Sequence, residues 1–179
     1  MFQRPNSGNG RISASRHAIR KFQAWYSWRI FLEIQRAKRQ NTGFGLIWLD
    51  IDHFKSINDN LGHQAGDQIL CRVALWLKAG VRPYDHPGRW GGDEFVVLLS
   101  PCDPETLHRI ALRIRESVEQ ESRKTGTQVT VSVGGYFALP GDSTDTILRQ
   151  ADRALYQAKD EGRNRVCITT SEDPEINPA

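Results

Sequence analysis

Residues 88–99 read "GRWGGDEFVVLL": two glycines, then two carboxylates, then an almost uninterrupted apolar run of strand length. The residues before the glycines are predicted to end one short strand, and residues 95–99 to form its antiparallel partner across the turn. Asp93 and Glu94 are therefore two like charges at the mouth of a buried strand, where their repulsion is unfavourable without a counter-charge. This stretch predicts a β-hairpin whose turn carries an acidic site.

A second acidic strand end lies upstream, where the apolar run "GLIWLDI" (45–51) reaches Asp50. If the two strands are neighbours, Asp50, Asp93 and Glu94 converge at one edge of a sheet, and a divalent metal would remove their repulsion. Magnesium takes hard oxygen ligands together with water and substrate phosphates, and adjacent glycines let a bulky ligand approach. The spacing alone fits equally a Gly-Gly hairpin with exposed acids and an aspartate that caps a turn.

Length and composition indicate an ordinary globular chain. Its 179 residues suit one domain with a proper core. Three cysteines without close pairs argue against a disulfide framework or a zinc site and favour a reducing compartment. No apolar stretch is long enough to span a bilayer, and the N-terminus lacks the apolar core of a signal peptide. We therefore expect a soluble cytoplasmic protein without a transmembrane segment.

Charge is distributed unevenly along the chain. Residues 1–45 hold nine Lys and Arg and a single acid, Glu33, which leaves +8. Residues 46–179 hold 15 basic and 20 acidic residues, which leaves −5. The basic segment can contact a membrane surface, nucleic acid or an acidic protein. The favoured interpretation is a solvated arm followed by the polar face of a helix.

Hydrophobic periodicity and turn residues divide the chain into alternating elements and predict an α/β sandwich. A disordered basic arm (1–14), an aromatic amphipathic helix (15–40) and a flexible tail (171–179) flank the main body. The helix at 64–79 is expected to bury Ile69, Val73, Leu75, Trp76 and Leu77. Further helices are predicted at 53–60, 104–122 and 143–159, and strands at 45–51, 89–90, 95–99, 127–138 and 164–169.

Four stretches together identify a resemblance. They are "LDIDHFKSINDNLGHQAGD" (49–67), "RPYDHPGRWGGDEFVVLL" (82–99), "VTVSVGG" (129–135) and "ADRALYQAKDEGRNRV" (151–166). In this order and at these intervals they closely resemble the GGDEF family of diguanylate cyclases. The resemblance implies a catalytic domain at 41–170 with a palm-like, nucleotidyl-cyclase-like fold. Its sheet would be mostly antiparallel and flanked by helices, with an extra helix at the N-terminus.

The implied activity is that of a nucleotidyltransferase that condenses two GTP into cyclic di-GMP and two pyrophosphates. By position, the resemblance makes Asp50, Asp93 and Glu94 catalytic residues and metal ligands. The carbonyl of Ile51 is a possible further ligand of two Mg²⁺ (or Mn²⁺) ions per active site. Glu94 is either a ligand or the group that helps to deprotonate the attacking hydroxyl.

The same resemblance assigns the substrate contacts. Asn58 and Asp67 match residues that hydrogen-bond guanine, whose N1–H and N2–H₂ donors suit a carboxylate. Taken alone, both residue types are equally good helix caps. The remaining contacts are to phosphate. One is a turn whose backbone N–H groups bind the anion. The other is a pair of cations, four residues apart on one side of a helix end. These residues are His53, Phe54 and Lys55, followed by Lys159 and Arg163.

An R-x-x-D pattern lies just upstream of the hairpin. Arg82 and Asp85 resemble a site at which cyclic di-GMP inhibits family members, and Arg113 matches an additional arginine of that site. Guanidinium groups suit guanine edges and phosphates. The pattern is also compatible with an ordinary surface ion pair between Arg82 and Asp85.

The N-terminal helix departs from the family. The usual D-x-L-T-x-L-x-N-R segment is absent, and "RKFQAWYSWR" (20–29) stands in its place. Each domain would hold one GTP, so catalysis implies a homodimer with half a site on each chain. One hypothesis is that the aromatic residues Phe22, Trp25, Trp28 and Phe31 help to dimerise the protein. The alternative is that this helix packs on its own sheet.

Other functions remain open. A catalytically weak GGDEF domain can bind GTP or cyclic di-GMP as an interaction module, although such domains usually lose acids that this chain keeps. A different cyclase or polymerase on a palm-like fold is disfavoured by Asp67 and the R-x-x-D pattern. Nucleic-acid binding through the basic segment could coexist with catalysis.

Overall fold

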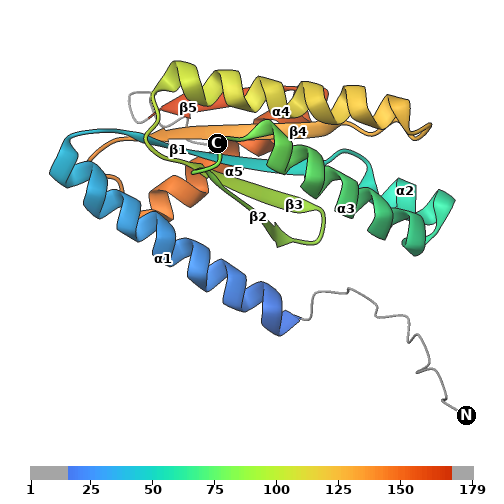
Figure 1. Cartoon of the computed structure of the whole chain (residues 1–179), viewed down its shortest axis with the longest axis horizontal. Coiled ribbons are helices and arrows are strands. Elements are labelled where there is room, and N and C mark those ends of the chain that lie inside the picture. The colour runs from blue at the N-terminus through green and yellow to red at the C-terminus, as the bar shows by residue number, and fades with distance from the viewer. Residues whose placement is uncertain (1–15, 171–179) are drawn as a thin grey trace, which may run out of the picture.

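The computed structural model describes residues 16–170; the predicted arm and tail lie outside the described residues. This part of the chain contains five helices and five strands, and they alternate except that α2 is followed by α3 and β2 by β3 (Figure 1). Their bounds are α1 (Arg16–Gln40), β1 (Phe44–Ile51), α2 (Phe54–Leu61), α3 (His63–Gly80), β2 (His86–Gly91), β3 (Glu94–Leu99), α4 (Pro104–Lys124), β4 (Val131–Ala138), α5 (Thr144–Asp160) and β5 (Val166–Thr170).

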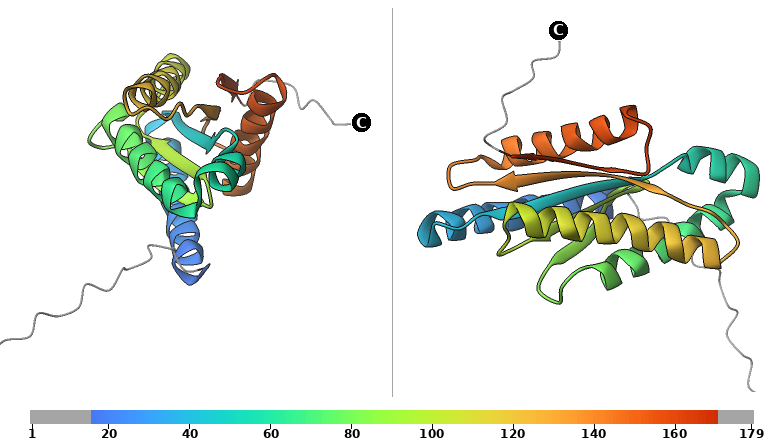
Figure 2. Two further views of the ribbon diagram at one scale, coloured as in Figure 1. Left: turned by 90° about the vertical axis from the view of Figure 1, so that its right-hand side faces the viewer. Right: turned by 90° about the horizontal axis from the view of Figure 1, so that it is seen from above.

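The strands form one sheet in the order β2-β3-β1-β4-β5. β1 lies in the middle, and every pairing is antiparallel except that of β4 with β5. Helices α3 and α4 cover one face of the sheet, and α1 and α5 cover the other (Figures 1 and 2). This is the predicted α/β sandwich with a mostly antiparallel sheet, so the predicted fold class is confirmed.

The central strand β1 is buried along its whole length. Side chains alternate between the faces of a strand, so Ile47, Leu49 and Ile51 join the core under α3 and α4. Leu46 and Trp48 join the second core under α1 and α5. Asp50 follows in the same alternation, which directs its carboxylate toward the α5 side of the sheet.

Two details of the prediction were wrong. The strand before the glycines was expected only at 89–90, but β2 already begins at His86, because the edge strand extends its pairing with β3 as far as Leu98. Leu75 is 67% exposed rather than buried. It lies on the opposite side of α3 from Ile69, Val73 and Leu77, which pack against the sheet.

Helix α1 packs against its own sheet through one face, as one of the two interpretations of its aromatic residues expected. Tyr26, Ile30, Ile34 and Ala37 are buried in the core shared with α5, and Phe22 packs at its edge. Trp25, Trp28 and Phe31 lie on the other face and are about half exposed. None of the helices within residues 16–170 is both long and apolar enough to cross a bilayer.

Candidate active site

The two acidic strand ends meet at one edge of the sheet. Asp50 of β1 and Glu94 of β3 are directly opposed residues of the antiparallel ladder. The Ile51 N–H donates to the carbonyl of Asp93 at 3.4 Å, which holds the residue before β3 against the end of β1. Asp50, Asp93 and Glu94 therefore converge, although 43 residues separate the first two in the sequence.

Hydrogen bonds from Arg89, which precedes it, stabilise the Gly91–Gly92 turn. Arg89 donates from Nε and Nη2 to the carbonyl of Gly92, at 2.9 and 2.6 Å. The ladder between β2 and β3 shifts register between Arg89 and Gly91, so Trp90 is a bulge. Such an irregularity redirects the chain next to a site, and here it leads directly into the acidic residues. Sequence reasoning assigned no role to Arg89.

Lys159 supplies the counter-charge. Its Nζ lies 3.0 Å from Oδ2 of Asp50. The last turns of α5 reach the site because α5 approaches β4 closely at Gly134. A Cβ at that position would lie 2.1 Å from the backbone nitrogen of Leu155, one helical turn before Lys159.

The carboxylates remain electrostatically unfavourable despite this lysine. Burial, followed by the charges of Asp93 and Asp52, raises the pKa of Asp50 against the opposing effect of Lys159. Burial, followed by the charge of Asp50, likewise raises the pKa of Glu94. Folding thus brings together like charges that a bound cation would stabilise.

The donor set suits a hard divalent ion, since carboxylate oxygens are what Mg²⁺ prefers. Asp50 and Glu94 fit such an ion best, because they oppose each other in the ladder and because burial, followed by the charge of Asp50, raises the pKa of Glu94. Within residues 16–170, however, no group of three or more His, Cys, Asp and Glu side chains is close enough to hold a metal.

Asp52 is a site residue to which sequence reasoning gave no role. It is buried and accepts hydrogen bonds from Thr130 Oγ1 (2.7 Å) and Ser132 Oγ (2.6 Å). It also accepts from the backbone N–H of Asn164, at 3.1 Å. Asp52 therefore fastens the end of β1 both to β4 and to the turn after α5. Its spacing of two from Asp50, which is typical of two residues on one face of a strand, was the available signal, although β1 itself ends at Ile51.

The proposed phosphate turn lies at the start of α2. His53 adopts a left-handed conformation (φ 57°) immediately before the helix, and its side chain makes no capping bond. Phe54 anchors the turn against the core, whereas Lys55 is exposed. The first N–H groups of a helix have no partner within it, so this turn is able to bind an anion.

Arg163 lies elsewhere than its spacing suggested. Helix α5 ends at Asp160, so Arg163 is not on the same side of a helix as Lys159. It lies in the following turn with φ 63°, after Gly162 at φ 115°, and its N–H donates to the carbonyl of Ala158. The exposed Arg163 is adjacent to Asn164, which Asp52 holds.

Asn58 of α2 lies against the start of α3, beside the residue that precedes Asp67. A Cβ on Gly66 would lie 1.9 Å from Oδ1 of Asn58, so the Asn58 amide lies over the Gly66 backbone. Asp67 is the next residue and is exposed. Neither residue caps its helix, because α2 and α3 begin after His53 and Gly62. The capping interpretation was therefore wrong for both.

The two charged residues of the R-x-x-D pattern, Arg82 and Asp85, bind each other directly. Arg82 donates to both Asp85 carboxylate oxygens, the shortest contact being Nη2 to Oδ1 at 2.8 Å, and its own backbone N–H donates to Oδ2 at 2.8 Å. The Asp85 side chain is fully buried, and Asp85 raises the pKa of Arg82. Arg82 also donates to the Pro101 carbonyl and lies 4.6 Å from the Tyr84 ring centroid. This is more than an exposed surface ion pair.

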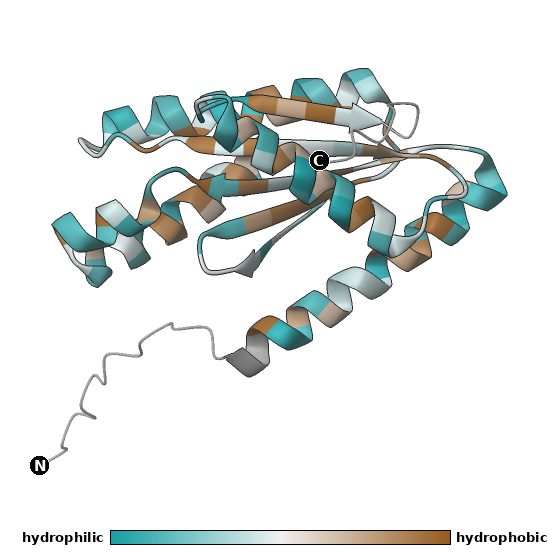
Figure 3. Ribbon diagram, turned by 180° about the vertical axis from the view of Figure 1, so that it is seen from behind, coloured by the Kyte–Doolittle hydropathy of each residue, from teal (hydrophilic) through white to brown (hydrophobic). Residues whose placement is uncertain are grey.

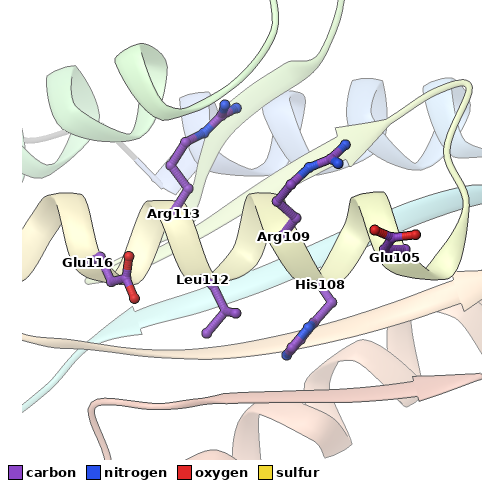
Figure 4. A pocket seen from close by; sticks show the side chains of 6 residues that line it. All are labelled: Glu105, His108, Arg109, Leu112, Arg113 and Glu116. Atoms are coloured by element: carbon purple, nitrogen blue, oxygen red, sulfur yellow. The ribbon is translucent and has the colours of Figure 1, made fainter.

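Arg113 lies close to this loop on α4, where its Nε donates to the carbonyl of Gly80 at 2.8 Å. It borders an open hollow of about 460 Å³ along α4. Arg113 and Arg109 point to the same side of this helix (Figure 4). The hollow is lined by Glu105, His108, Arg109, Leu112, Arg113 and Glu116.

Helix α1 braces the strand that joins these two regions. The Gln23 amide donates to the carbonyl of Trp90 (3.1 Å), next to the Gly91–Gly92 turn. The Tyr26 hydroxyl donates to the carbonyl of His86 (2.9 Å), at the opposite end of β2. The Phe22 ring fills the space where Gly88 lacks a side chain. Sequence reasoning did not identify Gln23 or Tyr26 as supports of the site.

Comparison with known proteins is consistent with this arrangement. The family model described as "Diguanylate cyclase, GGDEF domain" matches residues 27–165. The chain is 38% identical over 159 residues to the uncharacterized protein YhcK of Bacillus subtilis and 40% identical over 146 residues to the probable diguanylate cyclase DgcT of Escherichia coli. These matches cover 83% and 76% of the chain, but only 44% and 32% of the relatives. The chain thus spans less than half the length of either protein.

Solved structures agree with the sequence matches. The GGDEF domain of DgcB from Caulobacter crescentus, in complex with c-di-GMP, superposes with a TM-score of 0.76 at 32% identity, covering 82% of this chain and 86% of that one. The active GGEEF domain of a diguanylate cyclase from Vibrio cholerae gives 0.70 at 36% identity, covering 75% and 87%. With its acidic hairpin, its central strand and most of its length matched, this chain belongs to the GGDEF family of diguanylate cyclases.

Proposed function

We propose that this domain condenses two molecules of GTP into cyclic di-GMP with release of two pyrophosphates. The 3′-hydroxyl oxygen of one GTP forms a bond to the α-phosphorus of the other, whose bond to pyrophosphate breaks; a second such step closes the ring. The opposition of Asp50 and Glu94, next to Asp93 and Lys159, supports this proposal most directly. Acids that repel one another at a strand edge suit phosphoryl transfer better than they suit a structural role.

Asp50, Asp93, Glu94 and the Ile51 carbonyl would hold two Mg²⁺ or Mn²⁺ ions. When bound, the metal would promote ionisation of the attacking hydroxyl and neutralise charge on the leaving pyrophosphate. Lys159 already contacts the Asp50 carboxylate, so its ammonium would be free to bind the terminal phosphates if a metal ion held that carboxylate instead. Arg163 reaches those phosphates from the adjacent turn.

The nucleotide would extend from the carboxylate edge toward α2 and α3. The N–H groups at His53, Phe54 and Lys55 would bind phosphate oxygens at the start of α2. Asn58, which lies against Gly66, and the exposed Asp67 that follows it would accept and donate hydrogen bonds at the guanine edge. An adenine lacks the adjacent N1–H and N2–H₂ donors of guanine and carries an acceptor at N1, so it matches the Asp67 carboxylate poorly, which favours GTP over ATP.

One domain offers one such set of contacts, so the active species would be a homodimer with a GTP on each chain. Holding both nucleotides in line supplies a large part of the acceleration. We propose further that cyclic di-GMP inhibits the enzyme at Arg82, Asp85 and Arg113. The Arg82–Asp85 unit presents a fixed guanidinium, and Arg113 lies within reach of the same loop.

The direct test is incubation of the purified chain with GTP and Mg²⁺, with chromatography of the product. We expect cyclic di-GMP from GTP and none from ATP, and no product from Asp93→Asn. Replacement of Asp93 leaves the β1–β3 register in place, so this control separates chemistry from folding. Absence of turnover at any protein concentration, with GTP still bound, would support the alternative of a GTP- or cyclic di-GMP-binding module.

A further inference from the structure

The face of α1 that points away from the sheet forms a continuous row, which we call the α1 outer face. Its centre is aromatic: Trp25, Trp28 and Phe31 are 46, 55 and 49% exposed. Lys21 and Arg39 lie at the two ends of this row, on the same side of the helix. The 18 residues from one to the other make five complete turns, with a total length of about 27 Å. Both are exposed. In Figures 1 and 2, α1 lies at the outside of the molecule, so this face is accessible.

The charges on α1 have one sign where they are exposed. Arg20, Lys21, Lys38 and Arg39 are all exposed. The one acidic residue of α1, Glu33, is buried on the opposite side, where it accepts a hydrogen bond from Ser100 at 2.6 Å and lies near Arg29 and Arg36. The α1 outer face therefore combines aromatic side chains in its middle with cations at its ends. In Figure 3, hydrophilic and hydrophobic residues are mixed along α1.

A second copy of the chain is a poor occupant of this face. In an antiparallel pair of α1 helices, Lys21 of one would face Arg39 of the other, and in a parallel pair each cation would face its own copy. The seam at positions 21, 25, 28, 32, 35 and 39 is apolar only at Trp25, Trp28 and Leu32, too few positions for a coiled coil. Half-exposed aromatic side chains leave roughly 300 Å² open in total, whereas a stable interface buries about 800 Å² per partner.

We propose that the α1 outer face docks the protein on an anionic lipid surface. Indole rings favour the boundary between headgroups and acyl chains, because they are apolar with one polar N–H. Cations at both ends of the row would be attracted by the negative surface potential of such a membrane. A helix whose other face is fixed to a folded domain can lie in the interfacial plane without inserting deeply.

The charge of the rest of the chain also favours docking with the α1 outer face toward the lipid surface. Residues 46–179 carry a net charge of −5, whereas residues 1–45 carry +8. A negative surface therefore attracts the α1 side of the molecule and repels the rest. Docked chains would share one orientation in two dimensions, which raises the encounter rate of two domains that each hold a nucleotide.

The test is cosedimentation of the full chain with vesicles of pure phosphatidylcholine and with vesicles that contain equal parts of phosphatidylcholine and phosphatidylglycerol. We expect binding to the anionic vesicles that falls with added salt, and little binding to phosphatidylcholine. Trp25→Ser with Trp28→Ser should weaken binding about tenfold or more, by loss of apolar area. Lys21→Glu with Arg39→Glu should weaken it at least as much, by about tenfold or more.

Leu75→Ser with Tyr156→Ser is the matched control, since these side chains are 67 and 71% exposed on α3 and α5. It should leave vesicle binding unchanged. Melting curves check that both α1 variants remain folded, and the charge variant alters only exposed side chains. Equal binding to both vesicle types, or equal weakening by the control, would overturn the proposal. So would a fall in solution mass caused by the tryptophan variant, or tighter binding to a single-stranded oligonucleotide than to the vesicles.

Discussion

The carboxylate edge and the Arg82–Asp85 loop lie at opposite ends of β2 and handle charge in opposite ways. In the loop, a buried carboxylate has its guanidinium and a backbone N–H, and its charge is fully satisfied. At the edge, Asp50 and Glu94 share one lysine, and the pKa of each is raised. Burial alone does not distinguish these regions. The difference shows that the region left with uncompensated charge is where a cation and a substrate are needed.

Replacing Asp50 should produce the largest contrast between activity and stability. Asp50→Asn should lower cyclic di-GMP synthesis by roughly a thousandfold, because metal binding is lost. The metal-free protein should melt at the same or a higher temperature, since a buried like charge is removed. Turnover assays and thermal melts in chelator would measure both. A large fall in melting temperature would mean that Asp50 is a structural residue.

Lys159→Met should lower both the activity and the stability of the protein. Activity should fall about a hundredfold, because a cation for the terminal phosphates is lost. The metal-free protein should also lose about 1–3 kcal/mol of unfolding free energy, because Asp50 is left without its partner. Denaturant titration with and without Mg²⁺ provides the measurement. A variant whose stability is unchanged in chelator would show that the contact with Asp50 contributes nothing.

Arg82→Ala tests the Arg82–Asp85 loop, in which the buried carboxylate has its counter-charge. It leaves the buried Asp85 carboxylate without its guanidinium, so the unfolding free energy should fall by about 1–3 kcal/mol. Initial velocity should stay within about twofold of the parent, whereas inhibition by added cyclic di-GMP should weaken at least tenfold. Inhibition that persists unchanged would place the inhibitory site away from this loop.

Gln23→Met should produce a smaller effect at a distance. It keeps the size of the side chain but removes the donor to the Trp90 carbonyl, and a hydrogen bond of this kind contributes about 1 kcal/mol. We expect kcat to fall about fivefold, with GTP affinity unchanged, because Gln23 touches the turn and not the nucleotide contacts. An equal change in kcat and in the dissociation constant for GTP would contradict this assignment.

The smallest effect is a pH dependence of the metal-free protein. The folded-state pKa of Asp50 and of Glu94 is raised above the unfolded value, so their stabilising contribution is present below about pH 4. It is lost as the pH rises through the raised folded-state values. Unfolding free energies measured in chelator across this range should show the loss, and Asp50→Asn should reduce it. Excess Mg²⁺ should also reduce it, by binding the ionised form.

Sequence reasoning reached the fold and the convergence of the acids because both follow from short-range patterns. The alternation in β1 and the glycine hairpin locate Asp50, Asp93 and Glu94 once two strands pair. It did not reach residues whose role depends on distant partners. Asp52 is defined by Thr130, Ser132 and Asn164, and Gln23 by the carbonyl of Trp90.

The ends of helices and strands were also predicted poorly from the sequence. Arg163 was expected on the side of a helix with Lys159, but α5 stops three residues earlier and the chain turns through a left-handed conformation. The aromatic residues of α1 divided between two environments, which a pattern of three- and four-residue spacing does not reveal. Only the packing against β2 separates Phe22 and Tyr26 from Trp25 and Trp28.

The close approach of α5 to β4 has a consequence for how this domain can be inactivated. Gly134 lies under the backbone of Leu155, with room for a hydrogen atom and nothing larger. A single methyl group there would lift the end of α5 off the sheet and carry the Lys159 ammonium away from Asp50. An alanine at Gly134, which is not one of the proposed substrate contacts, would thus silence synthesis by tilting a helix, while every residue that handles substrate stayed intact.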